Sequence, residues 1–343
     1  MTKVKGYWKL FYSLFVLSLV LAVFLIGCGQ KGEGAASAGK ANGEKIQVYT
    51  SIFPLYDFTR TIGGEHVQVT NLLPPGAEGH DYEPSAKDMA KLNEAKLFIY
   101  NGAGYETWIE NVTKNLDPQK TKALDASQGL QLIETEMHEH EGEHAHEGEH
   151  SHKGESVHEE DHSEHAHGKY DPHVWLNPML AKQQAEKVKN ALAEVDPAHK
   201  DAYEANYKKL AADLDALDKE YKDVIGKAKK KELVVSHKAF AYLTRQYGLI
   251  QLSVSGLSPS EEPSQQQLKS LIDTVKAHNI KYVAFEGLVE NKVAKTVQRE
   301  SGAEAVTLYT IENVTKEQFD AGKTYIDLMK ENLNTLKKVL EVQ

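Results

Sequence analysis

The chain has 343 residues, of which 41% are hydrophobic, and this length is enough for two globular domains with buried cores. Its formal net charge is −10, but residues 138–167 alone carry ten acidic residues and one lysine, so the rest of the chain is nearly neutral. Because no basic surface is indicated, nucleic acid and anionic membrane surfaces are not expected partners.

The first 28 residues have the pattern of an export signal. Three lysines precede an apolar run at residues 10–26. A transmembrane anchor is the alternative, because such a span needs about 20 apolar residues. The sequence LIGC, which ends at Cys28, resembles the lipobox of bacterial lipoproteins and predicts a signal peptide over residues 1–27 and a lipid on Cys28. Cys28 is the only cysteine, so an intramolecular disulfide is excluded, and residues 28–45 have the composition of a flexible tether.

From residue 46 onward, short β-rich runs alternate with helical patterns. In the first half, strands are expected in KIQVYTSIF, VQVTNLL and KLFIYN, with helices in YDFTRTIGG and SAKDMAKLNEA. After residue 230, strands are expected in ELVVS, IQLSVSG, KYVAFEG and AVTLYT, with helices in KAFAYLTRQYG, SQQQLKSLIDTVKAHN and NKVAKTVQRESG. This alternation predicts an α/β protein with two lobes, each containing a mainly parallel sheet.

Residues 177–231 lie between these two sets and contain no strand signal. Pro197 divides them into two helices. In the second helix, apolar and aromatic residues alternate at spacings of four and three: Tyr203, Tyr207, Leu210, Leu214, Leu217, Tyr221 and Val224. This stripe suits a coiled-coil dimer or packing within the chain, and we favour packing within the chain. The predicted organisation is an N-terminal lobe at 46–198, a long connecting helix at 199–229 and a C-terminal lobe at 230–343, which ends in a helix.

A run at residues 138–168 contains ten of the sixteen histidines: His138, His140, His144, His146, His150, His152, His158, His162, His165 and His167. Imidazoles that alternate with carboxylates can bind zinc, copper or nickel. However, a run with almost no apolar residue cannot bury itself or fix a coordination geometry. We therefore predict a disordered, auxiliary metal-binding loop, with a dispensable spacer as the alternative.

Three of the six remaining histidines, His80, His173 and His237, lie in loops beside predicted strands or at the starts of predicted helices. The other three, His66, His199 and His278, have polar neighbours typical of surface residues. Loops at the C-terminal ends of parallel strands converge on one crevice, so the first three histidines could meet between the lobes. Three neutral imidazoles and a carboxylate would complete a tetrahedral Zn²⁺ shell.

The sequence NGAGYET at residues 101–107 places two glycines after a predicted strand. Gly102 and Gly104 match the first two positions of a dinucleotide-binding fingerprint, but Thr107 stands at the third position. We therefore predict a close-packed turn.

Several long motifs resemble the zinc-type substrate-binding lipoproteins of bacterial ABC importers, over the whole mature chain. They are GHDYEPS, NGAGYETWIE, DPHVWLNP, SHKAFAYLTRQYGL and KTYIDLMKENLNTLKKVL. The resemblance implies two α/β lobes joined by one long rigid helix, with the metal in the cleft between them. It also implies that His80, His173 and His237 are ligands. Manganese-binding members carry a carboxylate where His237 stands, so zinc is the expected metal.

The resemblance places the fourth ligand just before the C-terminal helix, which indicates Glu312. Glu286 and bound water are the alternatives. Asp171, two residues before His173, could orient an imidazole from outside the metal shell, or could be a turn-forming residue.

The resemblance implies high-affinity capture of Zn²⁺ outside the cytoplasmic membrane and delivery to an ABC permease and its ATPase. We expect a monomer, anchored to the cell membrane by a lipid and facing the extracellular or periplasmic side. Alternatives are a binding protein for manganese or another divalent metal, or an adhesin or zinc-sensing lipoprotein. An enzyme is not expected, because a carboxylate in the fourth position would replace the water that metal catalysis needs.

Overall fold

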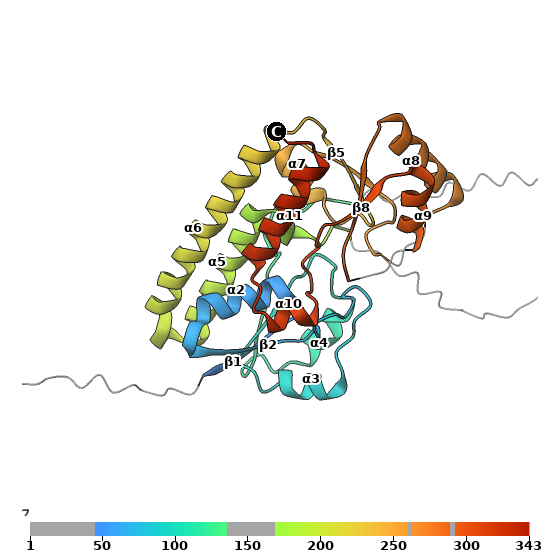
Figure 1. Cartoon of the computed structure of the whole chain (residues 1–343). Coiled ribbons are helices and arrows are strands. Elements are labelled where there is room, and N and C mark those ends of the chain that lie inside the picture. Colours follow the sequence, from blue (N-terminus) through green and yellow to red (C-terminus); the bar gives the residue numbers. More distant parts are fainter. Residues whose placement is uncertain (1–44, 136–168, 260–262, 289–291, 343) are drawn as a thin grey trace, which may run out of the picture. The chain divides into compact units, whose positions relative to one another are not determined.

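Two four-stranded parallel sheets organise the structure, a computed structural model that describes residues 45–135, 169–259, 263–288 and 292–342 (Figure 1). The first sheet has the order β2-β1-β3-β4, and the second has the order β6-β5-β7-β8. The strands of the first sheet are β1 (Ile46–Thr50), β2 (Val67–Asn71), β3 (Leu97–Tyr100) and β4 (Lys122–Asp125). Those of the second are β5 (Glu232–Val235), β6 (Ile250–Ser253), β7 (Tyr282–Phe285) and β8 (Glu304–Thr307). The prediction of two α/β lobes with parallel sheets is confirmed.

The helices follow the strands in the order that the alternation predicts. In the first half they are α2 (Phe53–Gly63), α3 (Ala86–Leu92) and α4 (Ile109–Asn115), and in the second α7 (Ala241–Tyr247), α8 (Gln265–Ala277) and α9 (Lys292–Ser301). The chain then forms α10 (Lys316–Asp320) and α11 (Tyr325–Val339). Three elements, β4, α4 and α10, were not predicted, because their sequences KALD, IENVTKN and KEQFD contain few apolar residues and show no clear periodic pattern.

Two longer helices, α5 (Pro178–Val195) and α6 (Lys200–Ile225), lie between the two sets of strands. The short 3₁₀ turn η3 (Pro197–His199) separates them, as Pro197 predicts. Helix α6 packs against α5, α2 and α11, and Figure 1 shows these helices side by side. The side chains of Tyr203, Leu214 and Tyr221 on its apolar stripe are fully buried in this contact. The stripe therefore packs within the chain, while the exact lobe limits at 46–198, 199–229 and 230–343 stay a prediction.

Four predictions concern residues outside those described: the signal peptide, the lipid on Cys28, the tether at 28–45 apart from its last residue, and the histidine-rich loop. Among the described residues, no helix is both long enough and apolar enough to cross a membrane.

Candidate metal centre

The structure brings together the three histidines that the sequence singles out. His80 lies in the loop between β2 and α3, His173 precedes the 3₁₀ turn η2 (Val174–Leu176), and His237 follows β5. The Nε2 atoms of His80 and His173 are 3.3 Å apart, and those of His173 and His237 are 3.5 Å apart. Zn–N bonds of about 2.0–2.1 Å at tetrahedral angles place two nitrogens about 3.4 Å apart. These two distances therefore match those between imidazoles on one zinc ion, and the ligand atoms of all three histidines lie within 4.8 Å of one another.

Burial keeps two of these imidazoles in the neutral form that binds metal. His173 and His237 are fully buried, and His80 is partly buried. Desolvation lowers the pKa of His80 well below its ordinary value, and the neighbouring rings of His173 and His237 add to this effect. Desolvation also lowers the pKa of His173, although Asp171 acts in the opposite direction. Neither of these two rings therefore needs to lose a proton at neutral pH before it binds zinc.

Each buried histidine also contacts a carboxylate through its other ring nitrogen. Asp171 Oδ1 accepts hydrogen bonds from the backbone N–H and the ring Nδ1 of His173, both at 2.9 Å. Glu286 Oε1 lies 2.5 Å from Nδ1 of His237 and also accepts the hydroxyl proton of Ser236. Since an ionised carboxylate can only accept, each Nδ1 is the donor and each Nε2 faces the cluster.

The charges of Glu286 and His237 stabilise each other. Burial alone would lower the pKa of His237, but the carboxylate of Glu286 outweighs it and the pKa is raised. Burial alone would raise the pKa of Glu286, but His237 outweighs it and the pKa is lowered. Glu286 therefore contacts the Nδ1 side of the His237 ring and is not part of the cluster of the three histidines.

Glu312 lies in the segment between β8 and α10 and is 4% exposed. Its Oε2 has no hydrogen-bond partner in the described part of the chain, and burial raises the pKa of the carboxyl group to about 7. The described cluster of potential ligand atoms within 4.8 Å of one another contains the three histidines and neither Glu312 nor Glu286. The fourth ligand therefore stays a prediction.

The backbone around Glu312 is strained and tied to the first half of the chain. Ile311 has a φ of 65°, which is a rare conformation for a β-branched residue. Thr310 O accepts a hydrogen bond from Trp175 Nε1 at 2.6 Å, and Glu312 O accepts one from the backbone N–H of Phe53 at 2.9 Å. Bonds on both sides of Ile311 hold this conformation, as strained backbone at a functional site requires.

One wall of the site is an aromatic residue that the sequence analysis did not select. The ring of Tyr105 is 4.9 Å from that of His80 and 5.5 Å from that of Trp175, measured between centroids. Tyr105 is buried, and its hydroxyl has no hydrogen-bond partner in the described part of the chain. The available signal in the sequence was that Tyr105 follows a glycine-rich turn. However, the local sequence does not show that the ring of Tyr105 packs against His80.

The turn before Tyr105 is close-packed, as predicted. Gly102 has a φ of 76°, and a Cβ atom there would lie 2.3 Å from Asp125 Oδ1. Glu106 accepts hydrogen bonds from the backbone N–H groups of Asn101 at 2.7 Å and Gly102 at 3.0 Å. These two backbone N–H groups are therefore bound to the buried carboxylate of Glu106, and the turn has a structural role beside the site.

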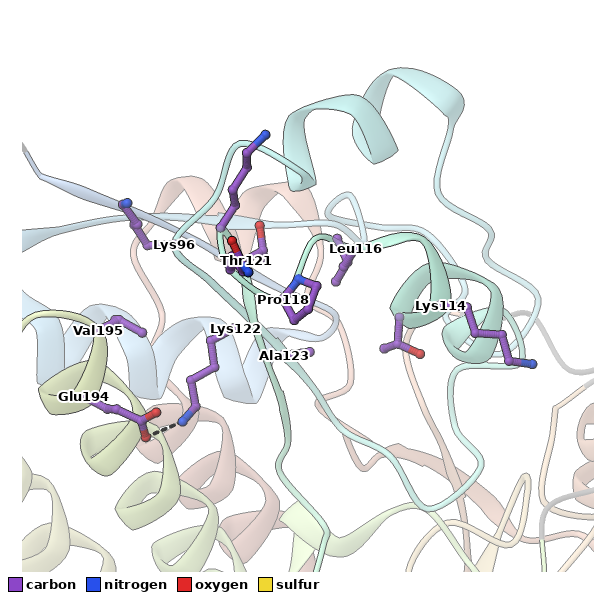
Figure 2. Close-up of a pocket in the computed structure, with 12 residues that line it drawn as sticks. Lys96, Lys114, Leu116, Pro118, Thr121, Lys122, Ala123, Glu194 and Val195 are labelled. Carbon is purple, nitrogen blue, oxygen red and sulfur yellow. Dashed lines mark ion pairs between the residues drawn. The ribbon is translucent and has the colours of Figure 1, made fainter.

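A surface pocket of about 780 Å³ lies elsewhere, between the end of α4 and the start of β4 (Figure 2). Four lysines contribute to its lining, and Lys122 is paired with Glu194. Lys96 and Lys114 extend in different directions in Figure 2 and do not converge on a common point. Its lining contains no histidine, so this pocket is separate from the metal centre.

The remaining described histidines lie outside the cluster. The rings of His66 and His199 stack with their centroids 3.8 Å apart, and Nδ1 of His199 lies 2.6 Å from Asp196 Oδ2. His278 is exposed. His66 and His199 are half-buried and paired, so the prediction of solvated surface residues holds only for His278.

The sequence over residues 48–339 matches the family described as zinc-uptake complex component A periplasmic. The chain belongs to this family. Its members are substrate-binding proteins of metal transport rather than enzymes, and they work with an ABC permease and its ATPase.

The chain is similar to the high-affinity zinc uptake system protein ZnuA of Bacillus subtilis, with 38% identity over 95% of this chain and 98% of that protein. It is 35% identical to the zinc-binding lipoprotein AdcA of Streptococcus pneumoniae over 95% of this chain, but covers only 60% of that longer protein. The crystal structure of the Zn(II)-bound ZnuA-like domain of AdcA superposes with a TM-score of 0.70 at 33% identity, covering 87% of this chain and 99% of that one.

Proposed function

We propose that this protein captures Zn²⁺ outside the cytoplasmic membrane and delivers it to an ABC importer. The observation that carries this proposal is the cluster of three imidazoles, in which Nε2 of His173 lies from Nε2 of His80 and of His237 at the distances expected for ligands of a single zinc ion. The family and the zinc named in its relatives support the same conclusion.

The proposed ligands are His80, His173, His237 and Glu312. The buried, unpartnered Oε2 of Glu312 supports its choice as the fourth ligand, because a buried carboxylate oxygen needs a cation or a donor. Oε2 of Glu286 also has no partner in the described part of the chain, but its Oε1 contacts both His237 and Ser236, which supports an orienting role outside the metal shell. A shell of three imidazoles favours Zn²⁺ over Mn²⁺, which prefers oxygen ligands.

The membrane location depends on residues outside the described part of the chain. The sequence LIGC before and at Cys28 supports cleavage and lipid attachment there, and AdcA is named a lipoprotein. The tether at residues 28–45 would leave a monomeric binding protein free to reach its permease.

Metal analysis of the purified native protein tests this function. We expect a single tightly bound Zn²⁺ per chain. We also expect His80→Ala, His173→Ala and His237→Ala each to weaken zinc binding by at least about 100-fold, because each removes a direct ligand. Exposed His278 provides the matched control, and His278→Ala should leave the tight site unchanged. Tight binding of a different metal in place of zinc, or unaltered binding in the three variants, would contradict the proposal.

A further inference from the structure

The loop that carries His80 is fastened to the segment that carries Glu312 by one side chain. Asn313 Nδ2 donates a hydrogen bond to Pro74 O at 2.7 Å and another to Ala77 O at 2.8 Å. Its Oδ1 accepts a hydrogen bond from the backbone N–H of Val314 at 2.9 Å. Asn313 is 4% exposed, and its three bonds use both ends of the amide group.

The turn that receives these bonds has a defined shape. Pro75 followed by Gly76 with a φ of 86° fits a type II turn, which is closed by a bond of 3.1 Å from the Ala77 N–H to Pro74 O. The turn directs the N–H of Gly76 to Val314 O at 2.8 Å. Asn313 and Val314 therefore bind this turn at three points.

The path from the turn to the metal centre is short. His80 is three residues beyond Ala77, and Glu78 Oε1 accepts a hydrogen bond from the His80 backbone N–H at 2.9 Å. At the other end, Asn313 is the residue next to Glu312. The two segments lie more than 200 residues apart in the chain, so the amide of Asn313 joins two separate parts of the site.

We propose that Asn313 is a positioning residue of the metal centre, which holds the His80 loop in place and thereby slows the release of zinc. The inference rests on the proposed function, because it assigns His80 to the zinc shell. His80 is the one histidine of the cluster that is only partly buried. Its loop is therefore the part of the shell that can open without disturbing the core around His173 and His237, and delivery to a permease requires such an opening.

Two substitutions separate the contacts of Asn313. Asn313→Asp keeps an oxygen that can accept from the Val314 N–H, but it removes both donors and places a carboxylate against two carbonyl oxygens. Asn313→Ala removes all three bonds. Asn206 offers a matched control, because its Nδ2 donates to Ile62 O at 3.0 Å in a half-buried position away from the cluster.

Hydrogen exchange of the zinc-free, full-length mature protein gives the first readout, which does not depend on metal. We expect amides of residues 76–82 to exchange about tenfold faster in Asn313→Asp and Asn313→Ala, and no local change there in Asn206→Ala. Protection at residues 76–82 equal to that of the native protein in both Asn313 variants would overturn the proposal. A purely structural role would instead raise exchange throughout the fold.

The second readout is the rate at which a chelator in excess removes zinc. Both Asn313 variants should release zinc about tenfold faster than the native protein, while Asn206→Ala should match the native rate. Unchanged release from both Asn313 variants would overturn the proposal. Failure of the zinc function itself would be visible separately, as the absence of tight zinc in the native protein.

Discussion

At the scale of single residues, two histidines of the site are each oriented by a carboxylate. His173 with Asp171, and His237 with Glu286, each place a carboxylate on Nδ1 and leave Nε2 for the metal. The sequence identified all four of these residues as candidates, because they lie in loops next to predicted strands or helices. It could not assign Glu286 its partner, since the contact with His237 spans 49 residues.

Substitutions of the two glutamates distinguish ligand from orienting residue. We expect Glu286→Gln to weaken zinc binding by about 10–100-fold, the usual loss when a partner outside the shell is changed. Glu312→Gln should cause the larger loss, because it replaces a charged ligand with a neutral amide. Competition with a chelator measures both affinities. A larger loss in Glu286→Gln would identify Glu286 as the fourth ligand.

Glu106 should give the zinc-free protein a distinctive pH dependence. Burial raises its pKa from 4.5 to about 7, so between these values the folded protein holds a proton that the unfolded chain has lost. The free energy of unfolding therefore falls as pH rises through this window, by about 1.4 kcal/mol per pH unit from this group. The glutamine in Glu106→Gln cannot titrate. The free energy of unfolding of this variant, relative to that of the native protein, should therefore increase from pH 4.5 to 7. Urea unfolding measures the difference, and a constant difference would refute this prediction.

At the scale of elements, the long helix α6 shows how a pattern determines a structure only in part. The alternating stripe predicts the helix, and the alternative of a coiled-coil dimer follows from the same spacing. In the structure, other helices of the same chain pack against this stripe. The hydroxyl of Tyr221 also donates a hydrogen bond to Met329 O of α11 at 2.7 Å. The order of packing partners could not be predicted, because α2 and α11 are far from α6 in sequence.

Leu214 on α6 is fully buried, and Leu214→Ala should lower the free energy of unfolding by about 2–5 kcal/mol through the cavity that it creates. Lys208→Ala, at an exposed position on the same helix, should change it by less than about 0.5 kcal/mol. Urea unfolding of the zinc-free protein measures both. The midpoints should not depend on protein concentration, whereas a dimer formed through α6 would show such a dependence.

At the scale of the whole molecule, the metal centre exists because segments from both halves of the chain meet. The loop of His80, the turn before η2 and the end of β5 contribute one imidazole each, and the segment after β8 carries Glu312, the proposed fourth ligand. We therefore expect the histidine-rich run at 138–168, which lies outside the described residues, to have an auxiliary role.

Deletion of residues 138–167 should remove weakly bound zinc equivalents and leave the single tight site intact. A variant that keeps the length of the run but replaces its ten histidines with glutamine is the matched control, and it should show the same loss. Isothermal titration calorimetry with zinc counts both the weak sites and the tight site. Disappearance of the tight site would show that the run is essential to it.

The sequence by itself determined the α/β class, the long helix and the three histidines, because periodic apolar patterns and loop positions are local properties. Its resemblance to the zinc-type binding proteins also indicated zinc, because manganese-binding members carry a carboxylate where His237 stands. Only the tertiary structure decided that Glu286 contacts His237, that Tyr105 lines the site and that Asn313 holds the loop of His80. Each of these depends on contacts between segments distant along the chain, and such contacts form only when the two sheets and the helices between them pack together.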